Sequence, residues 1–317
     1  MIAGIALSPA LDVTYVVERL SGIQRPLDVV RVGGGKTLNA ARAARALGAP
    51  RVAASAALAG GAGADIAAHA RSQGLDLRVV DGQAPTRTCV SIFDRDASEL
   101  TEIYERPSPL SDDEADAVVD AALLAGAGGH SWFLLSGGIA PEQARRAVAR
   151  VRESGGAVAV DTHGAALPAA IDEGAGLVKV NRSEAVELLE CAPDARGQEL
   201  VVGLHARLTG SAGPDGPPIA IVTDGTDGAW AFDGRRVLRA PAIGPVGGFP
   251  VGSGDSFLGG LVTAIDAGGA LPDALALATA AGVANAQLPG AAVLDGAWAR
   301  DLAKRIEIEQ RASNALR

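Results

Sequence analysis

A short run of small residues around an aspartate, Gly252-Ser253-Gly254-Asp255, has the composition of a catalytic anion site. Small residues in succession allow a tight turn and a close approach of the backbone to a ligand. The apolar residues that follow have helical spacing, so the run is expected to open a helix. A helix N-terminus presents unpaired N–H groups and the positive end of the helix dipole, which favour a bound anion. Asp255, in that first turn, would be a base beside a phosphate.

Two other interpretations of this run stay open at the level of sequence. In the first, the run is a glycine-rich turn and Asp255 only stabilises the first turn of the helix. In the second, Gly254-Asp255-Ser256 carries the serine nucleophile of a hydrolase. That interpretation lacks a base, because in the common Ser…Asp…His order a histidine follows the serine. All four histidines precede it in this chain, namely His69, His130, His163 and His205.

A second glycine-rich run, Gly33-Gly34-Gly35-Lys36-Thr37-Leu38-Asn39, lies near the N-terminus. It is not a P-loop, because that motif needs a glycine five residues before Gly35, where Val30 stands, and a buried parallel strand ahead of it. The glycines instead allow the backbone to approach a sugar. Asn39 offers an amide to sugar hydroxyls, and Lys36 can meet a phosphate on the substrate.

Together the two runs resemble the signatures of the ribokinase-like (PfkB) sugar kinases. The segment Ser8-Pro9-Ala10-Leu11-Asp12 resembles the opening of the branch that contains the 1-phosphofructokinases and tagatose-6-phosphate kinases. The resemblance covers nearly the whole chain. It implies an α/β fold, a three-layer sandwich with a mostly parallel central sheet and a small β-sheet lid. It also implies ATP- and Mg²⁺-dependent phosphorylation of a hydroxyl on fructose 1-phosphate, fructose 6-phosphate, tagatose 6-phosphate or a similar sugar phosphate.

The resemblance gives these motifs their roles in phosphoryl transfer. Asp255 would take the proton of the attacking hydroxyl, while the N–H groups of Gly252, Ser253 and Gly254 hold the charge on the transferring phosphoryl. Asp12, delivered to the binding edge by a strand at 2–7, would grip the sugar, although a turn aspartate after a proline is the plainer interpretation. The expected substrate-binding residues are Asp12, Gly34, Gly35, Lys36, Asn39, Arg87 and, as a weaker candidate, Arg25.

Arg87 and Lys36 are the cations expected to bind a phosphate already present on the substrate. By the resemblance they distinguish a sugar-phosphate kinase from a kinase for a free sugar. Most arginines are exposed on the protein surface. Arg87 and Arg25 can therefore also be interpreted as surface residues without a binding role.

The segment Thr223-Asp224-Gly225-Thr226-Asp227-Gly228 follows a buried strand predicted at 219–222 and resembles the nucleotide loop of the family. Its repeated Asp-Gly is also a signal for a β-hairpin, and the two interpretations are compatible. An alanine-rich helix at 271–286 is expected behind the adenine, where Asn285 would contact the base. The expected nucleotide-binding residues are Thr223, Gly225, Gly228, Gly254 and Asn285.

Asn181 and Glu184 stand three apart where a helix is predicted to follow a strand. Both oxygens would then lie on one face of the first turn and orient a water or a magnesium ion. An N-cap with a capping box explains the same two residues equally well. The resemblance assigns them to Mg²⁺, held through water, with Asp161 and Lys179 as lesser candidates nearby.

Two positions depart from the pattern of this branch. Thr37 follows the lysine where glycine is usual, and its side chain is expected to narrow the sugar pocket. Ser8 stands where asparagine is common. Substrate identity is therefore open, and two alternatives remain: a kinase for an unphosphorylated sugar or nucleoside, and a non-catalytic sugar-binding regulator of the same fold.

Strands and helices alternate along most of the chain, which predicts a parallel sheet covered on both faces. No linker divides the chain, so 1–317 is expected to form a single kinase domain. Expected strands lie at 2–7, 52–58, 132–135, 157–161, 177–180 and 219–222, and expected helices at 39–47, 112–124, 141–152, 198–208, 271–286 and 298–310. Arg42 and Arg45 are expected on the solvated face of the helix at 39–47. A polar loop is expected at 210–218.

Four short extended pieces, at 13–17, 27–32, 87–93 and 100–105, interrupt this alternation. By the resemblance they form the lid, from segments at about 13–32 and 87–105, through which two subunits would pair as a homodimer.

Composition narrows the classes of partner. The net charge of −9 argues against a nucleic-acid or anionic-membrane surface, since such partners need clustered cations. Cys89 and Cys191 have no metal-ligand spacing, as expected in a reducing compartment. No apolar run reaches the length of a membrane span, and the first residues lack the basic start of a signal peptide. We therefore expect a cytoplasmic protein whose partners are a sugar phosphate and ATP.

Overall fold

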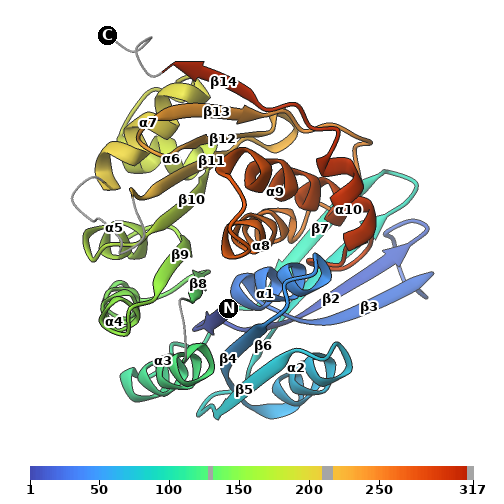
Figure 1. The fold of residues 1–317 in the computed structure, drawn as a ribbon. Helices are drawn as coiled ribbons and strands as arrows, with labels where there is room; N and C mark the ends of the chain where they lie inside the picture. Colours follow the sequence, from blue (N-terminus) through green and yellow to red (C-terminus); the bar gives the residue numbers. More distant parts are fainter. Residues whose placement is uncertain (128–130, 209–216, 313–317) are drawn as a thin grey trace.

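The computed structural model describes residues 1–127, 131–208 and 217–312, which fold into three layers with a ten-stranded sheet in the middle (Figure 1). Neighbouring strands from β5 to β11 pair in parallel, and β11 to β14 pair antiparallel, so the prediction of a mostly parallel sheet is confirmed. In spatial order the strands are β5 (Asp76–Asp81), β4 (Val52–Leu58), β1 (Ile2–Ala6), β8 (Trp132–Ser136), β9 (Ala157–Asp161), β10 (Leu177–Asn181), β11 (Ile219–Thr223), β12 (Ala229–Phe232), β13 (Arg236–Ala240) and β14 (Glu309–Ala312).

Helices cover both faces of this sheet, and each set packs on its own core of buried aliphatic residues. One face carries α1 (Lys36–Ala46), α2 (Gly60–Ser72), α8 (Ser253–Asp266), α9 (Leu271–Asn285) and α10 (Gly296–Ala303). The other carries α3 (Asp112–Gly126), α4 (Pro141–Glu153), α5 (Ala166–Asp172), α6 (Arg182–Leu189) and α7 (Gly197–Leu208).

The helices that follow the two glycine-rich runs, α1 and α8, lie in direct contact. A Cβ added at Gly259 of α8 would lie 2.4 Å from the carbonyl oxygen of Ala40 in α1, so only glycine allows this approach. On its other side α8 packs against α9 through Gly260, where a Cβ would lie 3.1 Å from Cα of Ala278. Small residues therefore bring the two motifs together although they are far apart in sequence.

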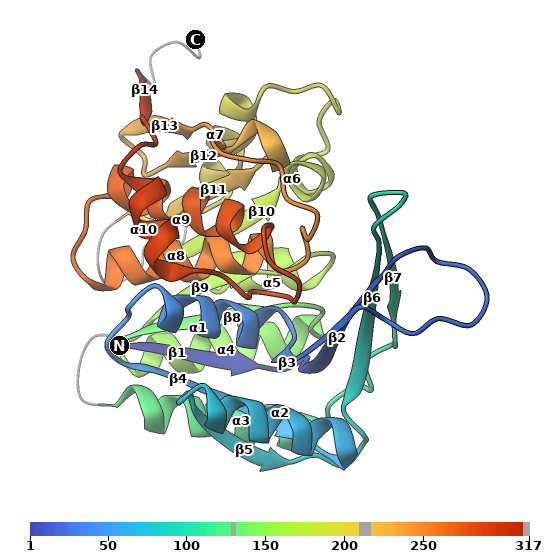
Figure 2. The same cartoon turned by 90° about the vertical axis from the view of Figure 1, so that its right-hand side faces the viewer.

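A separate four-stranded sheet forms the predicted lid, in the order β3-β2-β6-β7. Its strands are β2 (Ala10–Val17), β3 (Asp28–Gly34), β6 (Arg87–Asp94) and β7 (Glu99–Tyr104), which confirms the four extended pieces predicted from sequence. Figure 2 shows this sheet projecting from one edge of the body. The start of β2 and the end of β3 lie at its root, since Ala10 pairs with Gly34.

The parallel register gathers chemically active residues at one edge of the main sheet. Ser136 at the end of β8 pairs with Asp161 at the end of β9, and Asn181 at the end of β10 pairs with Thr223 at the end of β11. The carboxyl ends of parallel strands form the binding edge of an open α/β sheet. The ends of four strands thus lie along one edge, and they carry the predicted site residues Asp161, Asn181 and Thr223.

One sequence prediction about the C-terminal part is wrong, and another falls mostly on residues that the structure does not describe. The helix predicted at 298–310 ends at Ala303, and β14 then pairs with β13. Between the helix and this strand, Ile306 and Ile308 both pack on the core, and a spacing of two residues is the period of an extended chain and not of a helix. The loop predicted at 210–218 lies outside the described residues except for its last two. Among the described residues, no helix is long and apolar enough to cross a membrane.

Candidate active site

The run Gly252-Ser253-Gly254-Asp255 opens α8, as the sequence predicts. Gly252 is the N-cap and has φ 84°, a left-handed conformation that glycine adopts at little cost. A Cβ at this position would lie 2.3 Å from the backbone nitrogen of Ala292, so the position is also sterically closed to other residues. Asp255 lies in the first turn of the helix and is only 7% exposed.

The second run ends β3 and opens α1. Gly35 is the N-cap of α1 with φ 86°. A Cβ at Gly34 would lie 2.0 Å from Oδ2 of Asp12, so the missing side chain lets this carboxylate rest on the backbone. The predicted sugar-binding residues Asp12, Gly34 and Asn39 therefore form one compact group.

Asn39 connects this group to the catalytic run. Its Nδ2 donates a hydrogen bond of 2.9 Å to Oδ2 of Asp255, and it lies 3.4 Å from Oδ2 of Asp12. Two acidic residues from opposite ends of the chain therefore converge on one buried amide. An acceptor hydroxyl held by Asp12 would lie beside a candidate base.

The electrostatic setting of Asp255 suits a base near neutral pH. Burial raises its pKa to about 6, with a further contribution from repulsion by Asp161. Lys36, Lys179 and the hydrogen bond from Asn39 act in the opposite direction. A carboxylate with a pKa near 6 is ionised at pH 7 and still accepts a proton more readily than an ordinary aspartate.

Two lysines meet at a buried aspartate next to the N-terminus of α8. Oδ2 of Asp161 accepts a hydrogen bond of 2.5 Å from Lys179, and Oδ1 accepts one of 3.1 Å from Lys36. Burial alone would raise the pKa of Asp161, but the two ammonium groups lower it below its usual value. A Cβ at Gly254 would lie 3.1 Å from Nζ of Lys179, so this cation lies against the first turn of α8.

Arg87 reaches the same region from the lid. Its Nη2 donates a hydrogen bond of 3.2 Å to Oγ of Ser8, and Nη1 donates one of 3.3 Å to the carbonyl oxygen of Glu105. Its charge also acts on Asp12. Arg25 is exposed on the loop between β2 and β3, which extends away from the body in Figure 2, so within one subunit it is not part of the site.

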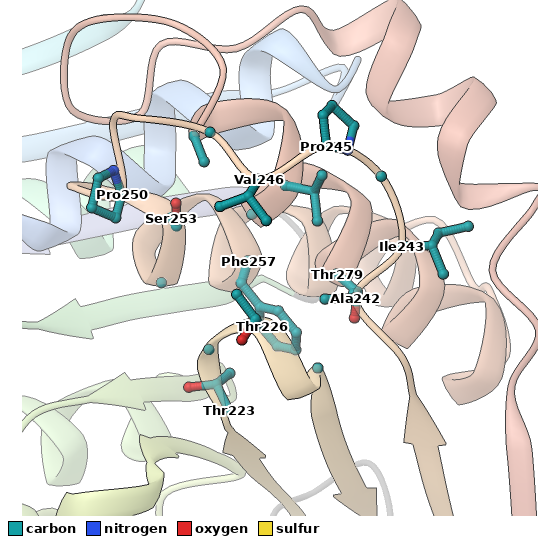
Figure 3. Close-up of a pocket in the computed structure, with 18 residues that line it drawn as sticks. Thr223, Thr226, Ala242, Ile243, Pro245, Val246, Pro250, Ser253, Phe257 and Thr279 are labelled. Atoms are coloured by element: carbon teal, nitrogen blue, oxygen red, sulfur yellow. The ribbon is translucent and has the colours of Figure 1, made fainter. Parts of the chain in front are cut away.

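A cavity of about 430 Å³ adjoins the first turn of α8 (Figure 3). Its polar lining includes Thr223, Thr226, Ser253 and Thr279, and its walls are mostly apolar, with Ile243, Pro245, Val246, Phe257 and Val283 among them. A mainly apolar pocket with a few polar groups is typical of a small-molecule site. The predicted nucleotide residues Thr223, Gly225, Gly228 and Gly254 all line it.

The hairpin and the nucleotide-loop interpretations of residues 223–228 are both compatible with this geometry. The N–H of Asp224 donates a hydrogen bond of 2.8 Å to the carbonyl oxygen of Gly228, which closes the turn between β11 and β12. Gly228 has φ 95°, and a Cβ there would lie 2.0 Å from the carbonyl oxygen of Ala240. The turn therefore needs glycine for its shape and presents its edge to the cavity.

Asn285 does not line this cavity, contrary to the sequence prediction. It is fully buried, and its Nδ2 donates to the carbonyl oxygens of Phe249 and Val251 and to Oγ of Ser253. The amide points to the segment that precedes α8 because three acceptors of that segment surround it. Asn285 thus holds the segment before α8 in place and has no exposed surface with which to contact a base.

Asn181 and Glu184 form the capping box that the sequence allowed. Oδ1 of Asn181 accepts from the backbone N–H of Glu184 at 2.9 Å, and Oε2 of Glu184 accepts from the backbone N–H of Asn181 at 2.8 Å. The charge of Glu184 also acts on Lys36, which places this helix start beside the lysine pair. The described residues contain no group of three His, Cys, Asp or Glu side chains able to hold a metal ion by themselves.

Three further interpretations of side chains are corrected by the structure. Thr37 does not narrow the sugar pocket, because it is buried and its Oγ1 donates to the carbonyl oxygens of Ile5 and Ser136. Ser256 is not an accessible nucleophile, since it is fully buried behind the first turn of α8. Arg42 is not on a solvated face, since it is only 8% exposed and its guanidinium donates to Asn39.

The sequence did not identify the apolar wall of the cavity, which residues 242–250 largely form. A signal was present, because this stretch is rich in proline and glycine and directly precedes the catalytic run. Phe249 in this stretch packs against Phe93 of the lid, with ring centroids 4.7 Å apart and the rings tilted by 49°. The wall of the cavity therefore also contacts the lid.

The fold has counterparts among solved structures. Phosphofructokinase-2 from Escherichia coli in complex with potassium matches with a TM-score of 0.84 at 20% identity, over 96% of this chain and 98% of that chain. A putative phosphofructokinase from Staphylococcus aureus matches at 0.79 and a possible 1-phosphofructokinase from Thermotoga maritima at 0.78, each at 18% identity over 98% of this chain and 99% of the other. Residues 4–295 match the model of a protein family described as "pfkB family carbohydrate kinase". The chain therefore belongs to the pfkB family of carbohydrate kinases, as its two glycine-rich runs predict.

Proposed function

We propose that the protein transfers the γ-phosphoryl group of ATP to a hydroxyl of a hexose phosphate, as a 1-phosphofructokinase or a related hexose-phosphate kinase does. The observation that carries this proposal is the position of Asp255. It is bonded to Asn39 of the sugar motif on one side, and it lies in the helix turn that lines the nucleotide cavity on the other. A base between an acceptor site and a donor site is what phosphoryl transfer to an alcohol requires.

In this proposal Asp255 accepts the proton of the sugar hydroxyl as the oxygen attacks the γ-phosphate. The backbone N–H groups of Gly252 and Gly254 face the charge that develops on the transferring group, aided by the dipole of α8. The N–H of Ser253, which was expected from the sequence to share this role, instead donates a hydrogen bond of 3.0 Å to the carbonyl oxygen of Pro250. Lys179 lies against Gly254 and adds a fixed positive charge at the same place. Such fixed donors and charges, together with positioning, supply most of the catalysis in phosphoryl transfer.

Asp12 and Asn39 hold the hydroxyls of the acceptor, and the bare backbone of Gly34 lets the sugar approach. Arg87 binds the phosphate carried by the substrate. Its contacts with Ser8 and with the carbonyl oxygen of Glu105 fix the guanidinium beside Asp12. The charge of Lys36 acts on Asp161, Asp255 and Glu184, so we assign Lys36 to the phosphates nearer the catalytic turn. This differs from the role expected from the sequence, in which Lys36 binds the phosphate already on the substrate.

The cavity beside α8 accommodates the nucleoside of ATP. Its apolar walls suit a base, and Thr223, Gly225 and Gly228 lie along its edge. Ser253 and Gly254 belong both to this cavity and to the anion-binding turn, so phosphates that extend from the cavity reach the N–H groups of α8.

The residues near the phosphate path fit a magnesium ion held through water. Glu184 uses Oε2 in its capping box, and among the described residues Oε1 accepts no hydrogen bond, so one carboxylate oxygen is left for a hydrated ion. Magnesium prefers oxygen ligands and keeps several waters, with substrate phosphates as its other ligands. When bound with ATP it would neutralise part of the phosphate charge, and Asn181 and Glu184 would orient its water shell.

The exposed apolar side chains of the lid support a homodimer formed through this sheet. Ile23 is 95% exposed and Ile103 is 59% exposed, and Leu20, Leu27 and Tyr104 are exposed in the same segments. Of the nine large apolar side chains that are exposed among the described residues, five lie in these lid segments, and exposed apolar surface commonly marks an interface. A second copy of this chain is the partner that we propose.

The test of the proposed activity is ADP release with MgATP across fructose 1-phosphate, fructose 6-phosphate, tagatose 6-phosphate, free hexoses and nucleosides. Turnover on one sugar phosphate supports the proposal and names the substrate. Turnover confined to an unphosphorylated acceptor would retain the kinase chemistry and contradict the role of Arg87. Acceptor binding without turnover for any nucleotide would favour a regulator.

A further inference from the structure

The buried guanidinium of Arg42 is a feature of the site that no motif identified. Arg42 lies in α1, one turn after Asn39, and only 8% of its surface is exposed. A buried arginine is costly unless its donors are satisfied and its charge is balanced. The structure meets both conditions, and the groups that do so belong to the catalytic site.

The donors of Arg42 reach three places. Nη1 donates to the carbonyl oxygen of Gly33, and Nη2 donates to the carbonyl oxygen of Ala291 and, at 3.1 Å, to Oδ1 of Asn39. The last of these bonds sets the direction of the Asn39 amide. With Oδ1 accepting from Arg42, the Nδ2 end is directed at Asp255 and Asp12.

The bond to Ala291 reaches the second motif. Ala291 and Ala292 lie directly against Gly252, because a Cβ at Gly252 would lie 2.9 Å from the carbonyl carbon of Ala291 and 2.3 Å from the nitrogen of Ala292. Gly33, on the other side, begins the glycine turn that carries Gly34 and Lys36. One side chain therefore fastens the sugar motif to the residues behind the catalytic turn.

The charge of Arg42 is balanced by the two carboxylates of the site. Burial lowers the pKa of Arg42 to about 10, and Asp12 and Asp255 oppose that shift. The other charged groups that act on Asp255 are Asp161, Lys36 and Lys179. Behind Arg42, on α2, the Nδ1 atom of His69 accepts a hydrogen bond from the N–H of Gly33 at 3.1 Å. Burial, aided by the Arg42 charge, lowers the pKa of His69, so that the imidazole is neutral at pH 7.

We propose that Arg42 is a positioning residue of the kinase site. It fixes the Asn39 amide with its N–H₂ group towards Asp12 and Asp255, and it supplies the buried positive charge that lets these two carboxylates stand close together. Its effect on turnover rests on the proposed kinase activity. Its effect on Asp255 does not, because the contacts exist in the protein without ligands.

The experiment compares Arg42→Met, which removes donors and charge, with Arg42→Lys, which keeps the charge and loses the planar set of donors. Arg45→Met is the matched control, since Arg45 is exposed on the same helix and donates to the carbonyl oxygen of Gln73. In Arg42→Met we expect the KM for the sugar to rise by about tenfold or more, the size of a lost hydrogen bond to a charged group. In the plot of kcat against pH, the fall in kcat on the acid side, which we call the acid limb, moves to higher pH. The KM for ATP changes little.

Arg42→Lys separates orientation from charge. Its acid limb stays at the wild-type position because the positive charge remains, while its KM for the sugar rises because the Asn39 amide is no longer held. A residue with a merely structural role would lower the melting temperature and the active fraction without moving the limb. Wild-type KM for the sugar in Arg42→Lys, or an unmoved limb in Arg42→Met, would overturn the proposal.

A ligand-free readout keeps this inference separate from the kinase proposal. ¹³C NMR titration of the aspartate carboxyls, with Asp255 assigned by its absence in Asp255→Asn, reports the pKa of that group without any turnover. We expect a higher pKa in Arg42→Met than in wild type, and no change in Arg45→Met. If Arg42→Met does not fold, Arg42→Lys decides through its sugar KM, or through sugar binding by calorimetry should the wild type show no turnover.

Discussion

The side-chain amide of Asn39 donates a hydrogen bond of 2.9 Å to Asp255 across 216 positions of sequence. The bond joins the glycine turn to which we assign the sugar to the helix start to which we assign the phosphate. Its acceptor is a buried carboxylate, so its strength and its consequences depend on protonation. The first two predictions follow from this relationship.

Asp255 is expected to reduce the stability of the folded protein at neutral pH. Burial raises its pKa from 3.8 to about 6, so the unfolded chain releases this proton at a lower pH than the folded protein does. The free energy of unfolding therefore falls as the pH rises from about 4 to 6, by up to about 3 kcal/mol from this group. Asp255→Asn removes the effect and should raise the melting temperature at pH 7.5 but not at pH 4.

The control for this prediction is Asp301→Asn, which removes an exposed carboxylate from α10. Its melting temperature should stay within the small range usual for surface changes at both pH values. Equal melting temperatures for wild type and Asp255→Asn at pH 7.5 would mean that the buried carboxylate carries no cost.

The pH dependence of turnover follows from the same group with the opposite sign. Catalysis needs ionised Asp255, and burial raises its pKa to about 6, so kcat should fall with a slope of one as the pH drops below about 6. The phosphate of a sugar phosphate also titrates near pH 6. The ¹³C titration of Asp255 is therefore measured alongside, and an acid limb that departs from it would assign the limb to the substrate.

Arg87 is expected to control affinity for the phosphorylated acceptor. Arg87→Ala should raise the KM for the sugar phosphate by about tenfold or more, as for a lost charge-assisted contact, with a smaller effect on kcat. Arg145→Ala on α4 is the control, because this arginine is 43% exposed and pairs only with Glu142 among the described residues. An unchanged KM in Arg87→Ala would remove the main reason for preferring a phosphorylated substrate.

The lid should pair two subunits through its exposed apolar side chains. Ile23→Glu places a charge on a side chain that is 95% exposed, so it should not disturb the fold of one subunit. We expect light scattering to give a dimer mass for wild type and a monomer mass for the variant. At concentrations low enough for both proteins to be monomeric, their melting temperatures should be equal. A wild-type protein that is monomeric at micromolar concentration would contradict the lid interface.

The sequence was sufficient for the features that depend on local chemistry. Gly252 and Gly35 were identifiable because the left-handed N-caps that they form call for glycine. The alternation of strands and helices predicted the parallel sheet, whose register then brought Asp161 and Thr223 to one edge. These inferences needed only periodicity and backbone sterics.

The failures concern side chains whose environment is set by distant segments. Arg42 was expected in solvent because its own helix has a polar face, but Ala291 of a far segment covers it. Asn285 was expected at the base, yet the loop at 249–253 supplies its acceptors. Thr37 turned inward because β1 and β8 offer carbonyl oxygens to its hydroxyl. No local pattern encodes these tertiary contacts.

The central claim is that Asp255 is the base of a phosphoryl transfer, and a single-turnover experiment tests it most directly. Wild type and Asp255→Asn are mixed with MgATP and the preferred acceptor at saturation, and product formation is followed by rapid quench, with nucleotide binding measured by calorimetry. We predict a rate lower by about 10² or more in Asp255→Asn, with ATP affinity unchanged, as for removal of a general base. A variant that keeps the wild-type rate within a few-fold would contradict the claim.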